Sequence, residues 1–203
     1  MLMMFLLTDH YIRGNTMKKQ LGLILIFAVL LIGFSGCIFK GNDDNNGSSG
    51  MPAIPVDNVS EIVALGNSIP SGFEYLGSRS LTSDDVNKDY AKAENVLEAS
   101  EGIYKSTARD YYIIAIKFSD ITSAESFIAN YKSTFKVLNN NETFQLVEFN
   151  GHEATRALSY STVGGKQAPR YKYFWSNDRI VFIIEGNSDD PTIGLDFAKA
   201  TGY

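Results

Sequence analysis

The chain has 203 residues, of which 44% are hydrophobic and 20% are charged. This composition is typical of one globular domain with appendages, and it excludes collagen-like, coiled-coil and wholly disordered chains. Without residues 1–36, 15 basic and 22 acidic side chains remain, a net charge of −7. Such an acidic chain repels phosphate backbones, so we expect no nucleic acid partner. Cys37 is the single cysteine, which excludes an intramolecular disulfide, a cysteine-ligated zinc site and an iron–sulfur centre.

An export signal precedes Cys37. Lys18 and Lys19 stand just before the apolar run 21–34, which ends in small residues, the layout of a secretory signal. The motif Phe34-Ser35-Gly36-Cys37 resembles the lipobox of prokaryotic membrane lipoproteins. The resemblance implies a diacylglyceryl group on the Cys37 thiol and cleavage just before it. Two alternatives stay open: an uncleaved membrane-spanning anchor over residues 21–39, and cleavage to a free secreted protein. All three place the remaining chain on the outer side of the cell membrane.

The sequence divides into four segments. We interpret residues 1–16 as an upstream extension or a mis-assigned start, because Met17 directly precedes the basic pair of the signal. Residues 17–36 then form the signal peptide, 37–59 the lipidated cysteine with a flexible tether, and 60–203 an extracytoplasmic domain.

Three Asn-x-Ser/Thr sequons make Asn46, Asn58 and Asn141 candidate glycosylation sites. The stretch 40–50 within the tether is rich in Asn, Gly and Ser, a composition that favours a flexible chain. Together with the lipobox, the tether and the sequons resemble archaeal surface lipoproteins.

Residue patterns predict the elements of the first half of the domain. Residues 73–81 and the β-branched and aromatic run 111–118 are predicted strands. The polar stretch 83–95 is predicted to be a loop with a helical turn. Apolar residues at helical spacing predict a helix over 123–135, with Thr122 or Ser123 as its cap.

The second half is predicted to be mostly strand. Residues 144–149 and 152–160 flank Asn150-Gly151, the favoured pair of a type I′ turn, and so predict a hairpin. Residues 167–175 and 179–185 predict another hairpin, and a helix over 191–200 follows, capped by Asp189 or Asp190.

These elements define an α+β fold: an antiparallel sheet of about six to seven strands with two helices packed on one face. The hairpin and helix of residues 104–131 resemble those of residues 171–200. A duplicated hairpin-helix unit would explain this likeness, and so would the similarity that any two such units share.

Few residues suggest catalysis. His152 is the single histidine beyond the signal, and the His-Glu-x-x-His and Gly-x-Ser-x-Gly patterns are absent. Gly164-Gly165-Lys166 lacks the spacing of a phosphate loop and fits a plain hairpin turn. We therefore predict no metal site and no cofactor. The alternative is an extracytoplasmic, hydrolase-like enzyme in which His152 acts with Glu153 or a nearby Asp.

Three aromatic residues alternate along one predicted strand. The two-residue period of a strand places Tyr171, Tyr173 and Trp175 on the same face. They either fill the core or form an exposed platform for a protein, glycan or small-molecule ligand. The sequence therefore favours a surface-exposed lipoprotein whose domain is a non-enzymatic binding or interaction module, anchored to the membrane.

Overall fold

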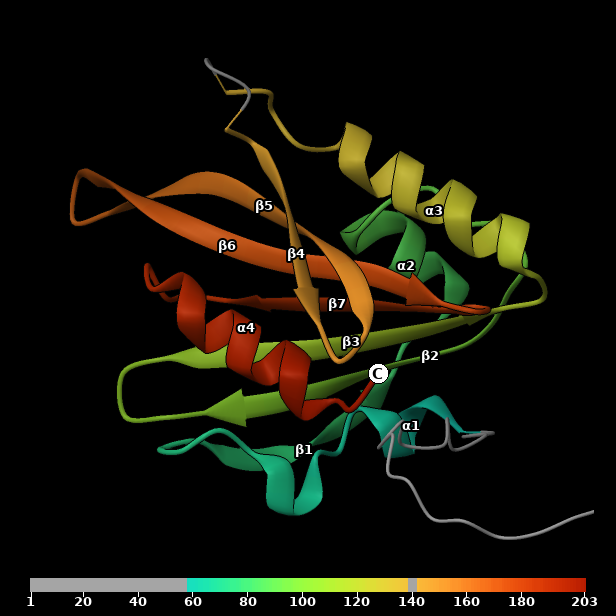
Figure 1. The fold of residues 1–203 in the computed structure, drawn as a ribbon, viewed down its shortest axis with the longest axis horizontal. Helices are drawn as coiled ribbons and strands as arrows, with labels where there is room; N and C mark the ends of the chain where they lie inside the picture. The colour runs from blue at the N-terminus through green and yellow to red at the C-terminus, as the bar shows by residue number, and fades with distance from the viewer. Residues whose placement is uncertain (1–57, 139–141) are drawn as a thin grey trace, which may run out of the picture. The chain divides into compact units, whose positions relative to one another are not determined.

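A seven-stranded antiparallel sheet forms the centre of the fold (Figure 1). The computed structural model describes residues 58–138 and 142–203. The strand order is β1-β2-β3-β7-β6-β5-β4. The strands are β1 (Glu74–Ser80), β2 (Val96–Lys105), β3 (Asp110–Phe118), β4 (Phe144–Phe149), β5 (His152–Val163), β6 (Lys166–Asn177) and β7 (Ile180–Gly186). The α-helices are α1 (Val59–Ile62), α2 (Ser83–Asp89), α3 (Ile121–Ser133) and α4 (Pro191–Ala200).

The central strand pair joins the two halves of the domain. Strands β1 to β3 form one antiparallel set and β4 to β7 the other, and the two sets meet where β3 pairs with β7. Helix α3 carries the chain from β3 to β4 at the far edge, and the chain then returns strand by strand to the centre. Pairing of Ile114 with Ile183 puts two fully buried side chains side by side at this junction.

Both faces of the sheet are covered, each by its own hydrophobic cluster. On one face, Ile113 and Ile184 pack with Phe197 of α4 and with α1. On the other face, Ile114 and Ile183 pack with α3 and α2. Consecutive residues of a strand point to opposite faces, so the nearly continuous apolar runs of β3 and β7 supply both clusters.

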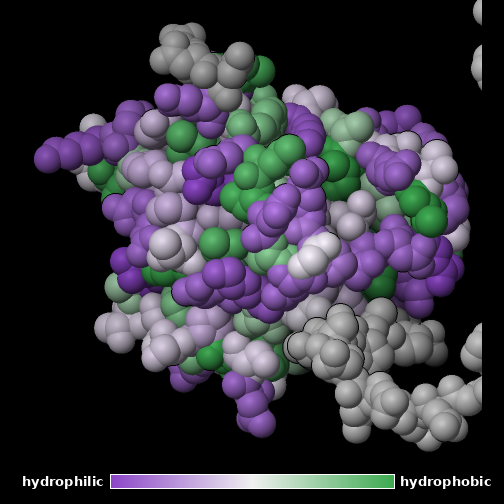
Figure 2. Space-filling view, viewed as in Figure 1, coloured by the Kyte–Doolittle hydropathy of each residue, from purple (hydrophilic) through white to green (hydrophobic). Residues whose placement is uncertain are grey.

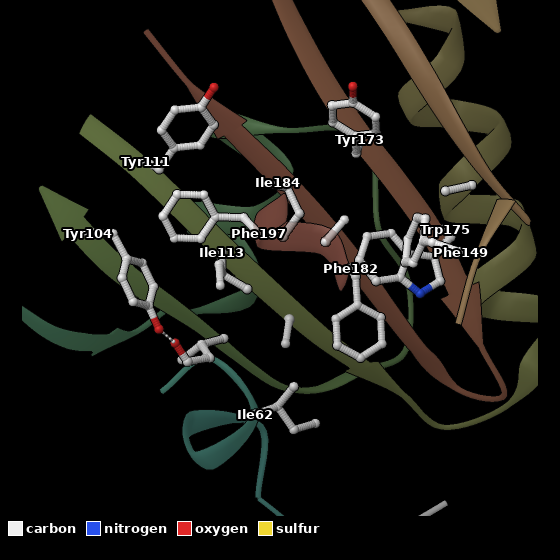
Figure 3. Packing of buried hydrophobic residues seen from close by; sticks show 14 of the residues in the cluster. Ile62, Tyr104, Tyr111, Ile113, Phe149, Tyr173, Trp175, Phe182, Ile184 and Phe197 are labelled. Atoms are coloured by element: carbon white, nitrogen blue, oxygen red, sulfur yellow. Dashed lines mark hydrogen bonds between the residues drawn. The ribbon is translucent and has the colours of Figure 1, made fainter. Parts of the chain in front are cut away.

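Aromatic rings make up much of the cluster under α4 (Figure 3). Phe197 stacks on Tyr111, with 4.9 Å between ring centroids, and lies 5.1 Å from the ring of Tyr104. The Tyr104 hydroxyl donates a hydrogen bond of 2.6 Å to the carbonyl oxygen of Val63 and accepts one from the Leu65 amide. These bonds fasten the segment after α1 to the sheet. Gly102 permits the contact, because a Cβ there would collide with the Val63 carbonyl.

The prediction of an α+β fold with an antiparallel sheet of six to seven strands is confirmed. The prediction that both helices lie on one face is wrong. Phe127 of α3 and Phe197 of α4 belong to different clusters, on opposite faces of the sheet. Physically, a central strand that is apolar on both faces needs cover on both sides.

The suggested duplication finds only partial support in the arrangement. Two hairpin-helix units, β2-β3-α3 and β6-β7-α4, lie symmetrically about the β3–β7 boundary. A two-fold axis through that boundary and normal to the sheet would keep both helices on one face. Because α3 and α4 lie on opposite faces, this operation does not carry one unit onto the other.

Most predicted elements are found close to their expected bounds. The Asn150-Gly151 turn has positive φ at both residues, as a type I′ turn requires. Helix α4 begins after Asp190, which accepts a hydrogen bond from the Thr192 amide. The cap of α3 differs: Asp120 accepts from the Ser123 amide at 2.8 Å, so the helix begins at Ile121, earlier than predicted.

The face that carries α4 is mainly hydrophilic (Figure 2). Its hydrophobic side chains are scattered in small groups among polar ones. Scattered apolar side chains are ordinary on a protein surface. Among the described residues, no helix is long and apolar enough to cross a membrane.

Replacing Phe197 by Ala tests the packing under α4. Removing a fully buried ring that contacts several others leaves a cavity, so we expect the free energy of unfolding to fall by about 3–5 kcal/mol. Denaturant unfolding of the full chain measures the change. Tyr160→Ala is the matched control, because Tyr160 is 51% exposed, and its substitution should change stability little. Equal losses in the two variants would contradict the packing.

Candidate functional site

The face of the sheet that carries α2 and α3 is apolar at one end and polar at the other. Tyr112 of β3 pairs with Glu185 of β7, and the register of β6 on β7 places Lys172 next in the same row. The adjoining row carries Asp110 and Arg170 on the same face, because side chains alternate along each strand. The polar row begins where the apolar residues that contact α3 end.

These side chains line an open groove on the sheet, which we call the sheet-face groove. Its volume is about 290 Å³. Residues of β3, β7, β6 and β5, with the turn after β7, contribute to it: Asp110, Tyr112, Ser159, Arg170, Lys172, Glu185, Gly186 and Asn187.

A second hollow adjoins the groove at Ser159, which lines both. Its volume is about 540 Å³, and it lies between β5, β6 and the segment after α3. The residues that line it are Lys136, Leu138, Ser159, Tyr160 and Gln167. Ligand sites in proteins are typically about 300–1,000 Å³, so the two hollows together offer room for a small ligand.

An ion pair crosses the floor of the groove. The Lys172 ammonium lies 2.5 Å from a carboxylate oxygen of Glu185, and the two side chains are 33% and 24% exposed. Partial burial reduces the screening of this pair by water. The pair therefore holds two long side chains in place in the middle of the groove.

Two tyrosines, Tyr131 of α3 and Tyr90 just after α2, lie near enough to Glu185 to be affected by its charge. Burial, and next the negative charge of Glu185, raise the pKa of the Tyr131 hydroxyl well above its usual range. Burial and the charges of Glu185 and Glu101 also raise the pKa of Tyr90. The Tyr131 hydroxyl is buried and has no hydrogen-bond partner among the described residues. Both tyrosines are therefore neutral at ordinary pH and act as polar but uncharged groups.

Of the two alternatives for the aromatic row, the structure supports the core. Tyr173 and Trp175 are 1% and 2% exposed and belong to the cluster under α4. Trp175 stacks on Phe182 at 4.9 Å. Tyr171 is partly buried, and the Arg156 guanidinium lies 5.5 Å from its ring centroid. The alternating row therefore fills the core, because its face of the sheet is covered by α4.

His152 lies on the opposite face from the sheet-face groove. It begins β5 and pairs with Phe149 of the α4-side cluster, and paired residues point to the same face. The neighbouring turn is fixed to α4, because the Asn150 side-chain amide donates to the Lys199 carbonyl oxygen. A histidine-based mechanism therefore cannot act on a ligand held in the groove.

Several predicted sites lie outside the described residues: Cys37, Asn46 and Asn141. Asn58 is described, and its side chain caps α1 by accepting from the Ser60 amide at 2.9 Å. In the parts of the chain that the structure describes, no group of three His, Cys, Asp or Glu side chains is placed to hold a metal ion.

Sequence reasoning missed the groove residues. Lys172 and Glu185 belonged only to the predicted strands 167–175 and 179–185, with no role assigned to either side chain. The useful signal was a charged residue at an inward position of an otherwise apolar strand, since β7 reads Ile-Val-Phe-Ile-Ile before Glu185.

Comparisons with known proteins leave the family open. No protein-family model matches the sequence, and no curated protein matches it. One similar solved structure is the extracellular domain of PknH from Mycobacterium tuberculosis, at 10% identity and a TM-score of 0.41, covering 71% of this chain and 89% of that chain. Another is an uncharacterised protein (Rv0999 ortholog) from Mycobacterium smegmatis, at 8% identity and a TM-score of 0.40, covering 72% and 96%. Likeness at this level carries no argument about the chain's role.

A double-mutant cycle of Lys172→Met and Glu185→Gln tests the ion pair in the groove. We expect a coupling energy of about 1 kcal/mol, because both groups are partly buried. Each single variant leaves one charge without its partner. The double variant should therefore lose less stability than the sum of the losses of the two single variants. Urea unfolding of the four proteins measures the coupling.

The pair Lys92–Glu94 provides the matched control. Its atoms are 2.8 Å apart, but the side chains are 75% and 71% exposed. Exposed pairs are screened by water, so the cycle of Lys92→Met and Glu94→Gln should show no measurable coupling. If this control couples as strongly as the groove pair, burial is not what strengthens the latter.

Proposed function

We propose that the chain is a membrane-anchored extracytoplasmic binding module, whose ligand lies in the sheet-face groove. The observation that carries the proposal is the groove itself: strands β3, β7, β6 and β5 bring charged, hydroxyl and aromatic side chains together on a face that helices cover only in part. Concave sites with a few convergent polar groups are the usual form of ligand sites.

The rigidity of the groove supports a role in binding. Its walls are residues of paired strands, and its floor is fixed by the Lys172–Glu185 ion pair. Side chains on a paired sheet need little ordering when a ligand arrives, which lowers the entropic cost of association. A preformed polar site of this size suits a small ligand.

Protein-observed NMR tests the groove. The full chain, labelled with ¹⁵N and held in detergent micelles, is titrated with a library of saccharides, short peptides and metabolites. We expect ligands to shift the amide signals of Lys172, Gly186 and Asn187. The matched comparison is the amide signals of α4, on the opposite face, which should stay in place. Shifts confined to α4 or to the β4–β5 turn, or no shifts at all, would refute the groove as the binding site.

The anchor is a separate part of the proposal. The lipobox-like motif ending in Cys37 supports a lipid on the thiol, which would hold the domain at the outer membrane surface. In the Cys37→Ser variant we expect the chain to be released or to persist as an uncleaved precursor, because the lipid acceptor is missing. Cell fractionation and the mass of the membrane-bound form measure this.

Ser35→Ala is the matched control, since it keeps a small residue in the motif and leaves the thiol in place. It should be processed and retained like the natural chain. Unchanged processing and retention of the Cys37→Ser chain would favour an uncleaved anchor over a lipid.

A further inference from the structure

Charges in the sheet-face groove are paired except for one. Lys172 neutralises Glu185 at 2.5 Å, and Lys105 lies 3.9 Å from Asp110. Arg170 remains: its guanidinium donates a hydrogen bond of 2.7 Å to the neighbouring Pro169 carbonyl and makes no ion pair within the described residues. A guanidinium has five N–H donors arranged as a planar fork, so most of this capacity is unused. The whole chain has a net charge of −5, so the unpaired Arg170 guanidinium is a positive site on an acidic protein.

Neutral polar groups around Arg170 are also unused. The Asn187 side-chain oxygen accepts from the Asp110 amide, but no described residue accepts from its Nδ2. The Ser159 hydroxyl lines the groove and makes no hydrogen bond to a described residue. Both groups can therefore form hydrogen bonds to a polar ligand in the groove.

An aromatic ring completes the site. Tyr112 lines the groove beside Asp110 and is partly buried. Burial, and next the charge of Asp110, raise the pKa of its hydroxyl, so the ring stays neutral. A tyrosine ring that is partly open to a groove provides a flat apolar surface against which a sugar ring can pack.

We propose that the sheet-face groove binds an acidic saccharide, with the sugar's anionic group on the Arg170 guanidinium and its ring against Tyr112. The hydroxyl group of Ser159 and the side-chain amide of Asn187 line the same groove and are placed to bond the sugar hydroxyls. A carboxylate matches the fork of a guanidinium with two parallel hydrogen bonds. This inference rests on the proposed function, because it names the ligand class of the same groove.

Four probes separate the parts of this proposal: D-glucuronate, D-glucose, acetate and inorganic phosphate. Saturation-transfer NMR with the full chain in detergent micelles measures the binding of each. We expect glucuronate to bind about tenfold or more tightly than glucose, because hydrogen bonds to a charged group are the stronger ones. Acetate and phosphate, which lack a sugar ring, should bind more weakly than glucuronate. Equal affinity for glucose and glucuronate, binding of acetate or phosphate as tight as that of glucuronate, or no binding of any probe would overturn the proposal.

Variants of Arg170 test the role of its fork. Arg170→Gln should abolish the preference for glucuronate and leave the affinity for glucose unchanged, whereas Arg170→Lys should keep only part of the preference, since it retains the charge and loses the fork. Arg179→Gln is the matched control: Arg179 stands at the turn before β7, at the other end of that strand from the groove. A preference that survives Arg170→Gln, or is lost in Arg179→Gln, contradicts the assignment.

Two controls keep the outcomes distinct. Amide spectra show whether Arg170→Gln is folded, and Arg170→Lys carries the test if it is not. Should the saccharide probes fail while other library ligands shift the groove amides, the ligand class is wrong and the binding module stands. When no ligand shifts those amides, both proposals fail together.

Discussion

The pairing of β3 with β7 is the constraint on which the rest of the structure depends. It joins two strands from opposite halves of the chain in the middle of the sheet. Both strands are apolar on both faces, and buried side chains such as Ile113 and Ile114 point to opposite sides. Each face must then be shielded from water. Helix α4 with α1 shields one, and α3 with α2 shields the other.

The groove follows from the unequal reach of these helices. Phe127 and Tyr131 of α3 pack on the apolar end of the sheet, with Ile114 and Phe174. At the other end the same face carries Lys172 and Glu185, which pair with each other where the helices cover the sheet only in part. Side chains in this part of the sheet are only partly exposed to water, so a pair of opposite charges can be accommodated there. The polar site is therefore a product of the same alternation that builds the core, continued past the last turn of the covering helix.

Prediction from the sequence succeeded where local chemistry decides structure. The Asn150-Gly151 turn, the cap of α4 and the apolar run of β3 each depend on neighbours in the chain, and all three are found. Strand β2 was anticipated only near Tyr104, because its centre, Glu98 to Gly102, is poor in strand-forming residues and is held by pairing on both sides.

The candidate site was beyond local reasoning for a related reason. A row of alternating aromatics stood out in the sequence, yet Tyr173 and Trp175 are core, since α4 lies over their face. The groove residues come from four strands and become neighbours only through the strand order. Arg170 and Asn187, for example, meet because β6 lies beside β7. Periodicity shows which residues share a face, but not which face a distant helix will cover.

The late closure of the sheet has a consequence for how the domain folds. During synthesis the N-terminal part of the chain appears first, so β1, β2 and β3 can form early. Strand β3 gains its second neighbour only when β7 has been made, after α3 and three further strands. During that interval β3, an apolar strand that is buried in the finished domain, has an open edge, the kind of surface that pairs with other chains. Such distant pairing also slows folding. Helix α3 follows β3 directly and packs on Ile114 and Ile116, so it can shield one face of the waiting strand before its partner arrives.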